Sequence, residues 1–555
     1  MKEVLKRDWL YLLLILALIV LTILKVSMFR FGFFTAFDEA YFLLKLQEAY
    51  DMSSITGKSQ WNLIAVHWFP YLDLTSKVNS YLASNILIWI SILVITCTSC
   101  VIYDKRHFFK YLALTWLIMF GLGNGLNYVR MQTAVLSWAL CAFMLFYHRT
   151  VIWKKVLYAS LCGLFLGLSV FIIIPAAMVL IMCVALLIII IYHEDRKNML
   201  LYLFSGVGGI LAAMSYMHLC ICDLGQIWEA MCFTASYIGN SGHGYDSMSF
   251  VIQYGLFFRD CIFVILAFVG AYWLSTRTKN KYIGTLLYVA LILVYSHYQV
   301  KPKVTVSMIM LSIPLLPLLF SRKKQAFSWQ IFKQTETWVT IFLLIFPPLA
   351  CLGTNISLGS RMLCFITAWL FIWYEREYKY PNEDFKRVKI AVILLFILPL
   401  PNVWKTYQQR DDSFHFSRGN RYFAEIALKE CQKNYFDNVY DIMQKYSYKS
   451  KQSVVFTACY DYCCLYAFDA VNSSNFHQVQ NFHYFDKSKM LKPDFIFMCK
   501  WDSVLIAKEL HEMPWGWPEE FDAYYVGTPE PEGAPWIIHP ELETRTLYCR
   551  KSLKQ

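Results

Sequence analysis

An adjacent pair of carboxylates stands at the start of the first long segment between apolar runs, in Phe-Asp-Glu-Ala-Tyr at 37–41. Asp38 and Glu39 would lie where water meets lipid, and partial burial there raises a carboxyl pKa towards a value suited to proton abstraction. We expect Asp38 to act as a general base and Glu39 to support it by position or hydrogen bonding. The alternative is that both are helix N-terminal charges, which the helix dipole favours.

Basic residues stand at the ends of other apolar runs, namely Arg130, Lys301, Lys303 and Arg361. A cation at the mouth of a membrane span can bind a phosphate or a carboxylate. The alternative is an interfacial anchor whose charge reaches back to water. His67 and Tyr128 are weaker candidates for substrate binding, and His67 has the alternative of being an interfacial or packed histidine.

One carboxylate pair and several cations together suit group transfer from a phosphorylated lipid. The carboxylate would deprotonate an acceptor hydroxyl while the cations stabilise the leaving phosphate. This chemistry requires that the acids and the cations face the same side of a membrane. Chance co-location is the alternative, because topology sends about half of all loops to each side.

The elements that must position these residues are membrane spans. Of the 555 residues, 57% are hydrophobic and 16% charged, whereas a soluble protein carries about 25% charged residues. This composition argues against a soluble multidomain enzyme, a disordered chain and a fibrous repeat. We expect an α-helical polytopic bundle of about 13 spans. They are placed at 9–29, 81–103, 111–126, 131–147, 156–174, 176–192, 199–221, 261–275, 282–299, 304–320, 337–352, 361–374 and 390–404. Pro175 is the natural break within the long run 156–192.

The net charge of +12 gives little reason to expect a nucleic-acid partner, because many of the basic residues stand in short segments between spans. Seven such segments alternate with nearly neutral ones, at 2–7, 105–110, 149–155, 196–197, 277–281, 322–333 and 376–389. Alternating Lys and Arg excess is the positive-inside signature. We therefore expect an integral protein of the bacterial inner (cytoplasmic) membrane with a cytoplasmic N-terminus.

The last 150 residues, 405–555, differ from the rest in having no run of spanning length. An odd number of spans places them outside the cytoplasm. A helical pattern over 418–446 precedes strand-length apolar runs at 454–458, 495–499 and 546–549. This order predicts an extracytoplasmic soluble α/β domain at 405–555, after a transmembrane domain at 1–404. The domain is either a rigid cap or a direct contributor to substrate binding.

These features resemble the C-type membrane glycosyltransferases, in particular the branch of protein O-mannosyltransferases and aminoarabinose transferases. The similarity lies in the loop that opens with Asp38-Glu39, in a glycine-containing span from Gly163 to Pro175, and in the stretch Ser296, Lys301 or Lys303, Pro314 and Pro317. In that group the first-loop Asp is the catalytic base. This chain has Ile173-Ile174 where relatives often carry Lys-Gly, and it has no Asp-x-Asp motif, so metal-independent transfer is the preferred interpretation.

The resemblance implies an inverting glycosyltransferase that uses a polyprenyl-phosphate-linked sugar donor and acts on the extracytoplasmic face. Its acceptor would be a glycan, a lipid or a protein, its surroundings membrane lipids, and no cofactor is expected. A lipid or polysaccharide transporter or flippase is one alternative, which predicts charged residues within spans and related halves. A non-catalytic envelope-assembly protein is the other.

Overall fold

The chain forms two compact units in the computed structural model. The helical unit comprises Met1–Leu24, Ser84–Leu224 and Tyr245–Trp404, and the mixed unit comprises Lys25–Ala83, Gly225–Gly244 and Lys405–Gln555. The structure describes residues 2–30, 37–50, 60–120, 125–229, 232, 252, 254–256, 258–259, 262, 266, 290, 332–352, 361–379, 413–415, 425–457, 462–473, 490–528 and 544–555. A boundary between these units falls at Trp404/Lys405, and residues 25–83 and 225–244 cluster with 405–555.

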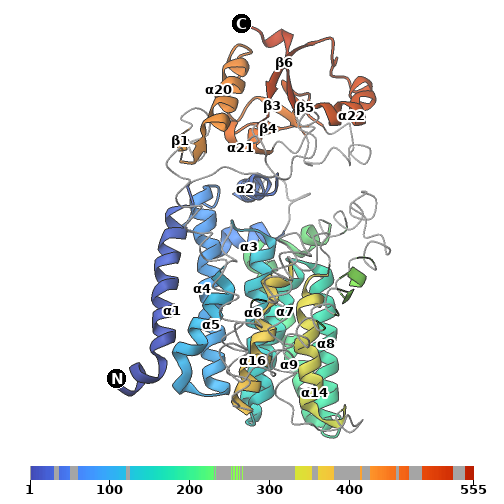
Figure 1. Ribbon diagram of the computed structural model, residues 1–555. Helices are drawn as coiled ribbons and strands as arrows, with labels where there is room; N and C mark the ends of the chain where they lie inside the picture. The colour runs from blue at the N-terminus through green and yellow to red at the C-terminus, as the bar shows by residue number, and fades with distance from the viewer. Residues whose placement is uncertain are drawn as a thin grey trace. The chain divides into compact units, whose positions relative to one another are not determined.

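The helical unit is built from long apolar helices (Figure 1). They are α1 (Lys2–Ser27), α4 (Lys77–Ile102), α5 (Phe108–Met119), α6 (Tyr128–His148), α7 (Ile152–Val170), α8 (Ile174–Tyr192), α9 (Arg196–Tyr216), α14 (Thr335–Ala350) and α16 (Thr367–Lys379). Within the described ranges, 6 helices are long and apolar enough to cross a membrane. The protein is therefore an integral membrane protein.

Most predicted spans coincide with these helices. The predicted spans at 261–275, 282–299, 304–320 and 390–404 lie outside the described residues apart from single positions, so the total of about 13 stays a prediction. The predicted break is confirmed, since α7 ends at Val170 and α8 begins at Ile174 with Pro175 in its first turn. Proline is tolerated there because its missing N–H would have had no partner within the helix.

Hydroxyl side chains inside the apolar helices bond to their own backbone. Ser91, Thr96 and Ser99 on α4 each donate to the carbonyl four residues earlier, at 2.7–2.8 Å. These bonds satisfy polar groups where no water would reach them.

Helices α7 and α9 pack closely through glycines. A Cβ built on Gly163 would lie 2.0 Å from the carbonyl oxygen of Gly206, and one on Gly209 would lie 2.0 Å from that of Ser160. Gly208, in contrast, has nothing within 4 Å of such a Cβ. Small residues let helix backbones approach and gain van der Waals contact, which is a main source of helix association in lipid.

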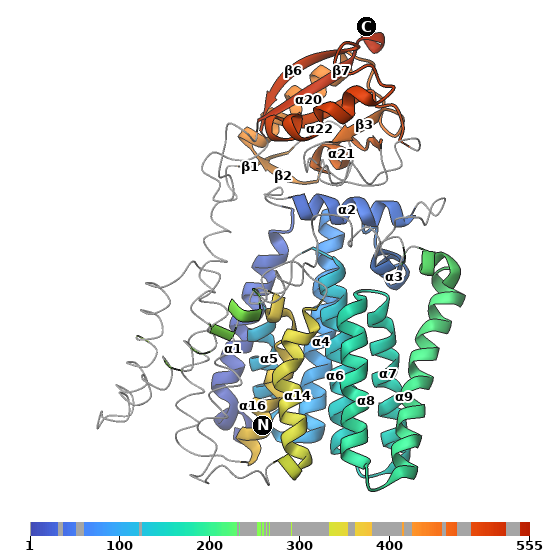
Figure 2. The same cartoon turned by 90° about the vertical axis from the view of Figure 1, so that its right-hand side faces the viewer.

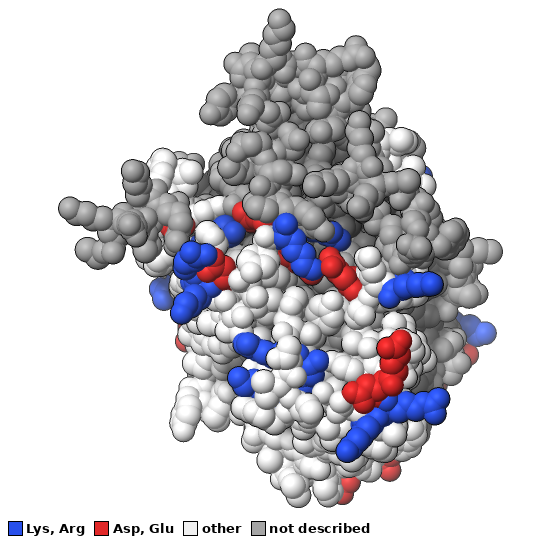
Figure 3. All heavy atoms as spheres, turned by 90° about the horizontal axis from the view of Figure 1, so that it is seen from below, with Lys and Arg blue, Asp and Glu red and all other residues white. Residues whose placement is uncertain are grey.

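Basic residues gather at one end of the helical unit (Figure 3). Because successive helices reverse direction, the turns α4–α5, α6–α7 and α8–α9, the start of α14 and the end of α16 share this end. These segments carry Lys105, Arg106, Lys110, Arg149, Lys154, Lys155, Arg196, Lys197, Lys333, Arg376 and Lys379. The grouping is the one that the charge pattern predicts, and its orientation across the membrane stays a prediction.

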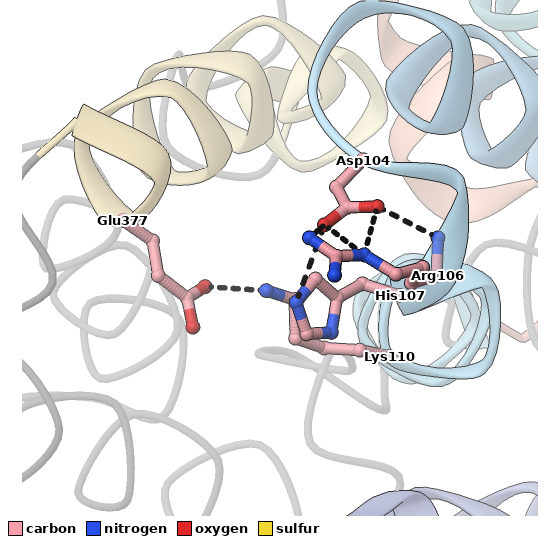
Figure 4. Close-up of polar contacts among 5 residues, drawn as sticks. All are labelled: Asp104, Arg106, His107, Lys110 and Glu377. Carbon is pink, nitrogen blue, oxygen red and sulfur yellow. Dashed lines mark hydrogen bonds and ion pairs between the residues drawn. The ribbon is translucent and has the colours of Figure 1, made fainter. Parts of the chain in front are cut away.

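Ion pairs connect helices at this basic end (Figure 4). Lys110 Nζ on α5 lies 3.2 Å from Glu377 Oε2 on α16, and the two side chains are 9% and 19% exposed. Next to them, Asp104 accepts hydrogen bonds from the Arg106 side chain and backbone, which lower the pKa of Asp104 to about 2. His107 Nε2 lies 3.9 Å from the same carboxylate.

The mixed unit contains a five-stranded sheet with the order β4-β3-β5-β7-β6. Figure 2 shows its paired strands β6 and β7 next to each other. Its strands are β3 (Val454–Thr457), β4 (Val471–Asn472), β5 (Phe495–Cys499), β6 (Phe521–Gly527) and β7 (Arg545–Arg550). β3 pairs in parallel with β4 and β5, whereas β7 pairs antiparallel with β5 and β6. The helices of this region are α20 (Glu430–Gln444), α21 (Tyr462–Phe468) and α22 (Lys500–Glu512).

The strands predicted from short apolar runs are confirmed as β3, β5 and β7. The helix predicted over 418–446 is wrong at Ala427–Lys429, and residues 418–424 lie outside the described residues. β1 (Ser413–His415) pairs antiparallel with β2 (Ala427–Lys429), and α20 begins only at Glu430. A non-local strand pairing has overridden the local helical periodicity.

The mixed unit also includes α2 (Phe37–Tyr50) and α3 (Gln60–Trp68). Helix α2 begins at Phe37, directly before the acidic pair. Its residues Ala40, Leu43 and Leu46 are buried. Asn62 of α3 donates from its side chain to the carbonyl of Lys45 at 2.5 Å, which ties the two helices together.

Candidate functional site

Three predicted site residues lie together in the helical unit. Tyr128 is the first residue of α6, Arg130 is in the same turn, and Arg361 begins a helical segment that leads through η5 (Leu363–Phe365) into α16. Arg361 Nη2 donates to Tyr128 Oη at 2.6 Å, and the guanidinium carbon lies 5.0 Å from the Tyr128 ring centroid. A hydrogen bond and a cation–π contact therefore hold Arg361, which is 4% exposed.

Arg130 is positioned by the start of α6. The side chain of Asn127 accepts a hydrogen bond from the Arg130 backbone N–H at 3.1 Å, which caps the helix. Arg130 Nη1 donates to Cys364 Sγ at 3.3 Å. A thiol sulfur is a weak acceptor, so this contact compensates the partly buried guanidinium poorly.

Both arginines have unused hydrogen-bonding capacity. Arg130 Nε and Arg361 Nε are buried, and neither has a hydrogen-bond partner in the described part of the chain. A buried donor without an acceptor costs about 1–3 kcal/mol. Since a guanidinium is also a permanent cation, an anion with several acceptor oxygens is the ligand that would best satisfy this cluster. The start of α6 adds the positive end of a helix dipole.

Asp38 and Glu39 occupy the first turn of α2 in the mixed unit. A carboxylate at this position can be a charge that stabilises the start of the helix, and it can also act as a general base. Their convergence with Tyr128, Arg130 and Arg361 of the helical unit stays a prediction.

The other predicted residues are placed as follows. His67 lies near the end of α3 and is exposed. Lys301 and Lys303 lie outside the described residues. Across the ranges that the structure describes, no group of three His, Cys, Asp or Glu side chains could hold a metal ion.

Sequence reasoning missed Cys364. A cysteine in an apolar run is typically a small hydrophobic residue, and this one is buried. However, it stands three residues after Arg361, so the two lie on one face of a helical segment. That spacing was the available signal that Cys364 could contact the arginine cluster.

Comparisons with known proteins give likeness in structure only. No family model and no curated protein matches the chain. The Archaeoglobus fulgidus oligosaccharyltransferase in the apo form is 12% identical with a TM-score of 0.47, and the match covers 94% of this chain and 73% of that chain.

Two structures of ArnT from Cupriavidus metallidurans are also similar, each matching over 99% of both chains. The one bound to undecaprenyl phosphate is 9% identical with a TM-score of 0.45, and the apo state is 11% identical with a TM-score of 0.44. TM-scores below 0.5 assign no activity to this chain.

Proposed function

We propose that this protein is a membrane glycosyltransferase that transfers a sugar from a polyprenyl-phosphate donor to an acceptor hydroxyl. The observation that carries the proposal is the pair of arginines at helix starts, the partly buried Arg130 and the buried Arg361, whose buried Nε atoms have no partner among the described residues. A lipid phosphate supplies both the negative charge and the acceptor oxygens for these donors. Its polyprenyl chain suits a bundle of apolar helices.

The acids supply the second half of the chemistry. In this proposal Asp38 takes the proton of the acceptor hydroxyl, and the acceptor oxygen attacks the anomeric carbon of the sugar. The bond between that carbon and the phosphate oxygen breaks, and its electron pair stays on the phosphate. One displacement inverts the anomeric configuration. Glu39 supports Asp38, and His67 is a weaker candidate for substrate contact.

The cations stabilise the charge that develops on the leaving phosphate. Arg130 and Arg361 carry this role, with Tyr128 orienting Arg361 through its hydroxyl. Lys301 and Lys303 are proposed to join them. The basic end of the helical unit would face the cytoplasm, and the arginine cluster with residues 405–555 the opposite side of a bacterial inner membrane.

The direct test measures binding of undecaprenyl phosphate to purified protein in lipid nanodiscs. Loss of one charge-assisted contact is worth about 1.5–3 kcal/mol, or roughly 10–150-fold in Kd. We expect that increase for Arg361→Gln and Arg130→Gln. Arg106→Gln is the matched control, since Arg106 stands at the basic end with its side chain 75% exposed. Wild-type affinity in both cluster variants contradicts the proposed site.

Catalysis is tested separately through Asp38. Asp38→Asn keeps the size of the side chain and removes the base. We expect it to bind undecaprenyl phosphate as the wild type does, and to lose the release of undecaprenyl phosphate from lipid-linked sugars extracted from the host membrane. Full transfer activity in a correctly folded Asp38→Asn protein would falsify the base assignment.

A further inference from the structure

We propose that the C-terminal region, residues 405–555, positions α2, the helix whose first turn carries Asp38 and Glu39. Tyr466 and Asp469 are the positioning residues. The kinetic part of this proposal rests on the proposed function. The structural part does not, because it concerns contacts within the mixed unit alone.

Helix α21 of the C-terminal region packs directly against α2. Leu465, Tyr466 and Phe468 of α21 are at most 1% exposed, and on α2 Leu43 and Leu46 are at most 2% exposed. Just after α21, Asp469 Oδ1 accepts a hydrogen bond from Gln47 Nε2 at 2.8 Å. This bond fixes the face of α2 that carries Gln47 towards Asp469 and so restrains the rotation of α2 about its own axis.

A second contact reaches α2 through the segment that precedes α4. Tyr466 donates its hydroxyl to the carbonyl of Thr75 at 2.6 Å, and Tyr466 is 0% exposed. The same segment is tied to the end of α2, since Tyr50 Oη donates to the Leu72 carbonyl and accepts from the Leu74 N–H, both at 3.0 Å. Tyr466 therefore restrains the C-terminal end of α2 indirectly, through the segment that contains Leu72, Leu74 and Thr75.

Two further bonds join the C-terminal region to residues 25–83. Ser76 Oγ donates to Glu425 Oε2 at 3.1 Å, and the Ala427 N–H donates to the Arg30 carbonyl at 2.6 Å. Chain segments on both sides of α2 are thus attached to the C-terminal region. A cap that only covered the membrane part would need none of these specific bonds.

The distance along α2 between Gln47 and Asp38 explains why the contact matters for catalysis. Gln47 and Asp38 are nine residues apart, or about 13 Å along a helix, so a tilt of about 5° at Gln47 moves the first turn by about 1 Å. A misplacement of about 1 Å costs up to about 100-fold in rate. We therefore expect a loss in kcat with little change in donor affinity.

The test compares two buried tyrosines of the C-terminal region. Tyr466→Phe removes the hydroxyl that holds the Thr75 carbonyl. Tyr446→Phe is the matched control, because Tyr446 is also 0% exposed and its hydroxyl bonds to Asp522 and Tyr524, away from α2. Gln47→Glu places a second carboxylate against Asp469, and Gln47→Glu/Asp469→Asn restores a donor and an acceptor.

The first readout is hydrogen–deuterium exchange of the α2 amides. We expect about tenfold faster exchange in Tyr466→Phe and Gln47→Glu, wild-type exchange in Tyr446→Phe, and recovery in the double variant. The second readout is transfer from lipid-linked sugars, where kcat should fall about tenfold or more in the first two variants. The Kd for undecaprenyl phosphate should stay within about twofold in all variants, since the arginine cluster is untouched.

Unchanged α2 exchange in both Tyr466→Phe and Gln47→Glu overturns the proposal. Faster exchange with wild-type kcat also overturns it, because α2 would then be held without being positioned for catalysis. An equal loss in the Tyr446→Phe control would show general destabilisation and overturn it as well. Failure of the proposed function is recognised independently, by a wild-type protein that neither binds undecaprenyl phosphate nor releases it from lipid-linked sugars, whereas the exchange readout on α2 still tests the structural part.

Discussion

The packing of α7 against α9 makes a sharp prediction about two glycines. In Gly163→Ala, the new Cβ would stand 2.0 Å from the Gly206 carbonyl oxygen, whereas ordinary contact begins at 3.4 Å. The neighbour is backbone, so no side chain can rotate away. The helices must separate by more than about 1 Å locally, and overpacking of this kind costs about 1–3 kcal/mol.

Gly208→Ala is the matched control on the same helix pair. Its Cβ would meet nothing within 4 Å, so it gains only the higher helix propensity of alanine, about 1 kcal/mol. Gly163→Ala gains the same propensity term. The difference between the two variants therefore isolates the packing cost, and we expect Gly163→Ala to be less stable than Gly208→Ala by about 1–3 kcal/mol.

The assay is the free energy of unfolding of each purified variant in mixed detergent micelles, followed by loss of helical circular dichroism. A variant with valine at 163 should be less stable than the alanine variant. Equal stability of Gly163→Ala and Gly208→Ala would refute the predicted packing cost. The close approach of α7 and α9 would then make no contribution to the free energy of unfolding.

Three further outcomes follow from individual contacts. Glu377→Gln removes the ion partner of Lys110, whose side chain is 9% exposed, and should lower the free energy of unfolding by roughly 1–3 kcal/mol, less than for a fully buried pair. Asp522 accepts a hydrogen bond from Tyr446, which is the main cause that lowers the Asp522 pKa below its ordinary value of 3.8. Its stabilisation is present above 3.8 and is lost as the pH falls below that value, so thermal melts of wild type and Asp522→Asn should differ at pH 7 and converge in acid. Arg361→Lys keeps the charge but not the planar fork, so its Kd for undecaprenyl phosphate should lie between those of the wild type and Arg361→Gln.

Local patterns predicted the individual elements well where a single segment determines its own structure. Apolar run length placed α1, α4 and α6 to α9, and Pro175 placed the break before α8. Short apolar runs placed β3, β5 and β7. In each case the driving force, burial of an apolar run or the missing N–H of proline, acts within the segment itself.

Prediction failed where a distant partner decides the outcome. Residues 427–429 carry helical periodicity but form β2, because β1 supplies a pairing partner. The residue types of the arginine cluster were predicted, yet the bond from Arg361 to Tyr128 joins residues 233 positions apart. The contact with Cys364 was not predicted, since a cysteine in an apolar run has no distinguishing pattern.

The sequence by itself determined that this is a polytopic membrane protein and where its basic residues would gather, and it supplied the candidate residues for a phosphate site. These properties depend on composition and on periodicity along one segment. Only the tertiary structure decided that the buried Arg361 bonds to Tyr128, that Arg130 bonds to Cys364, and that α2 is held by α21 and Asp469. Both arrangements join segments hundreds of residues apart, and a linear pattern carries no information about which distant surfaces bury each other.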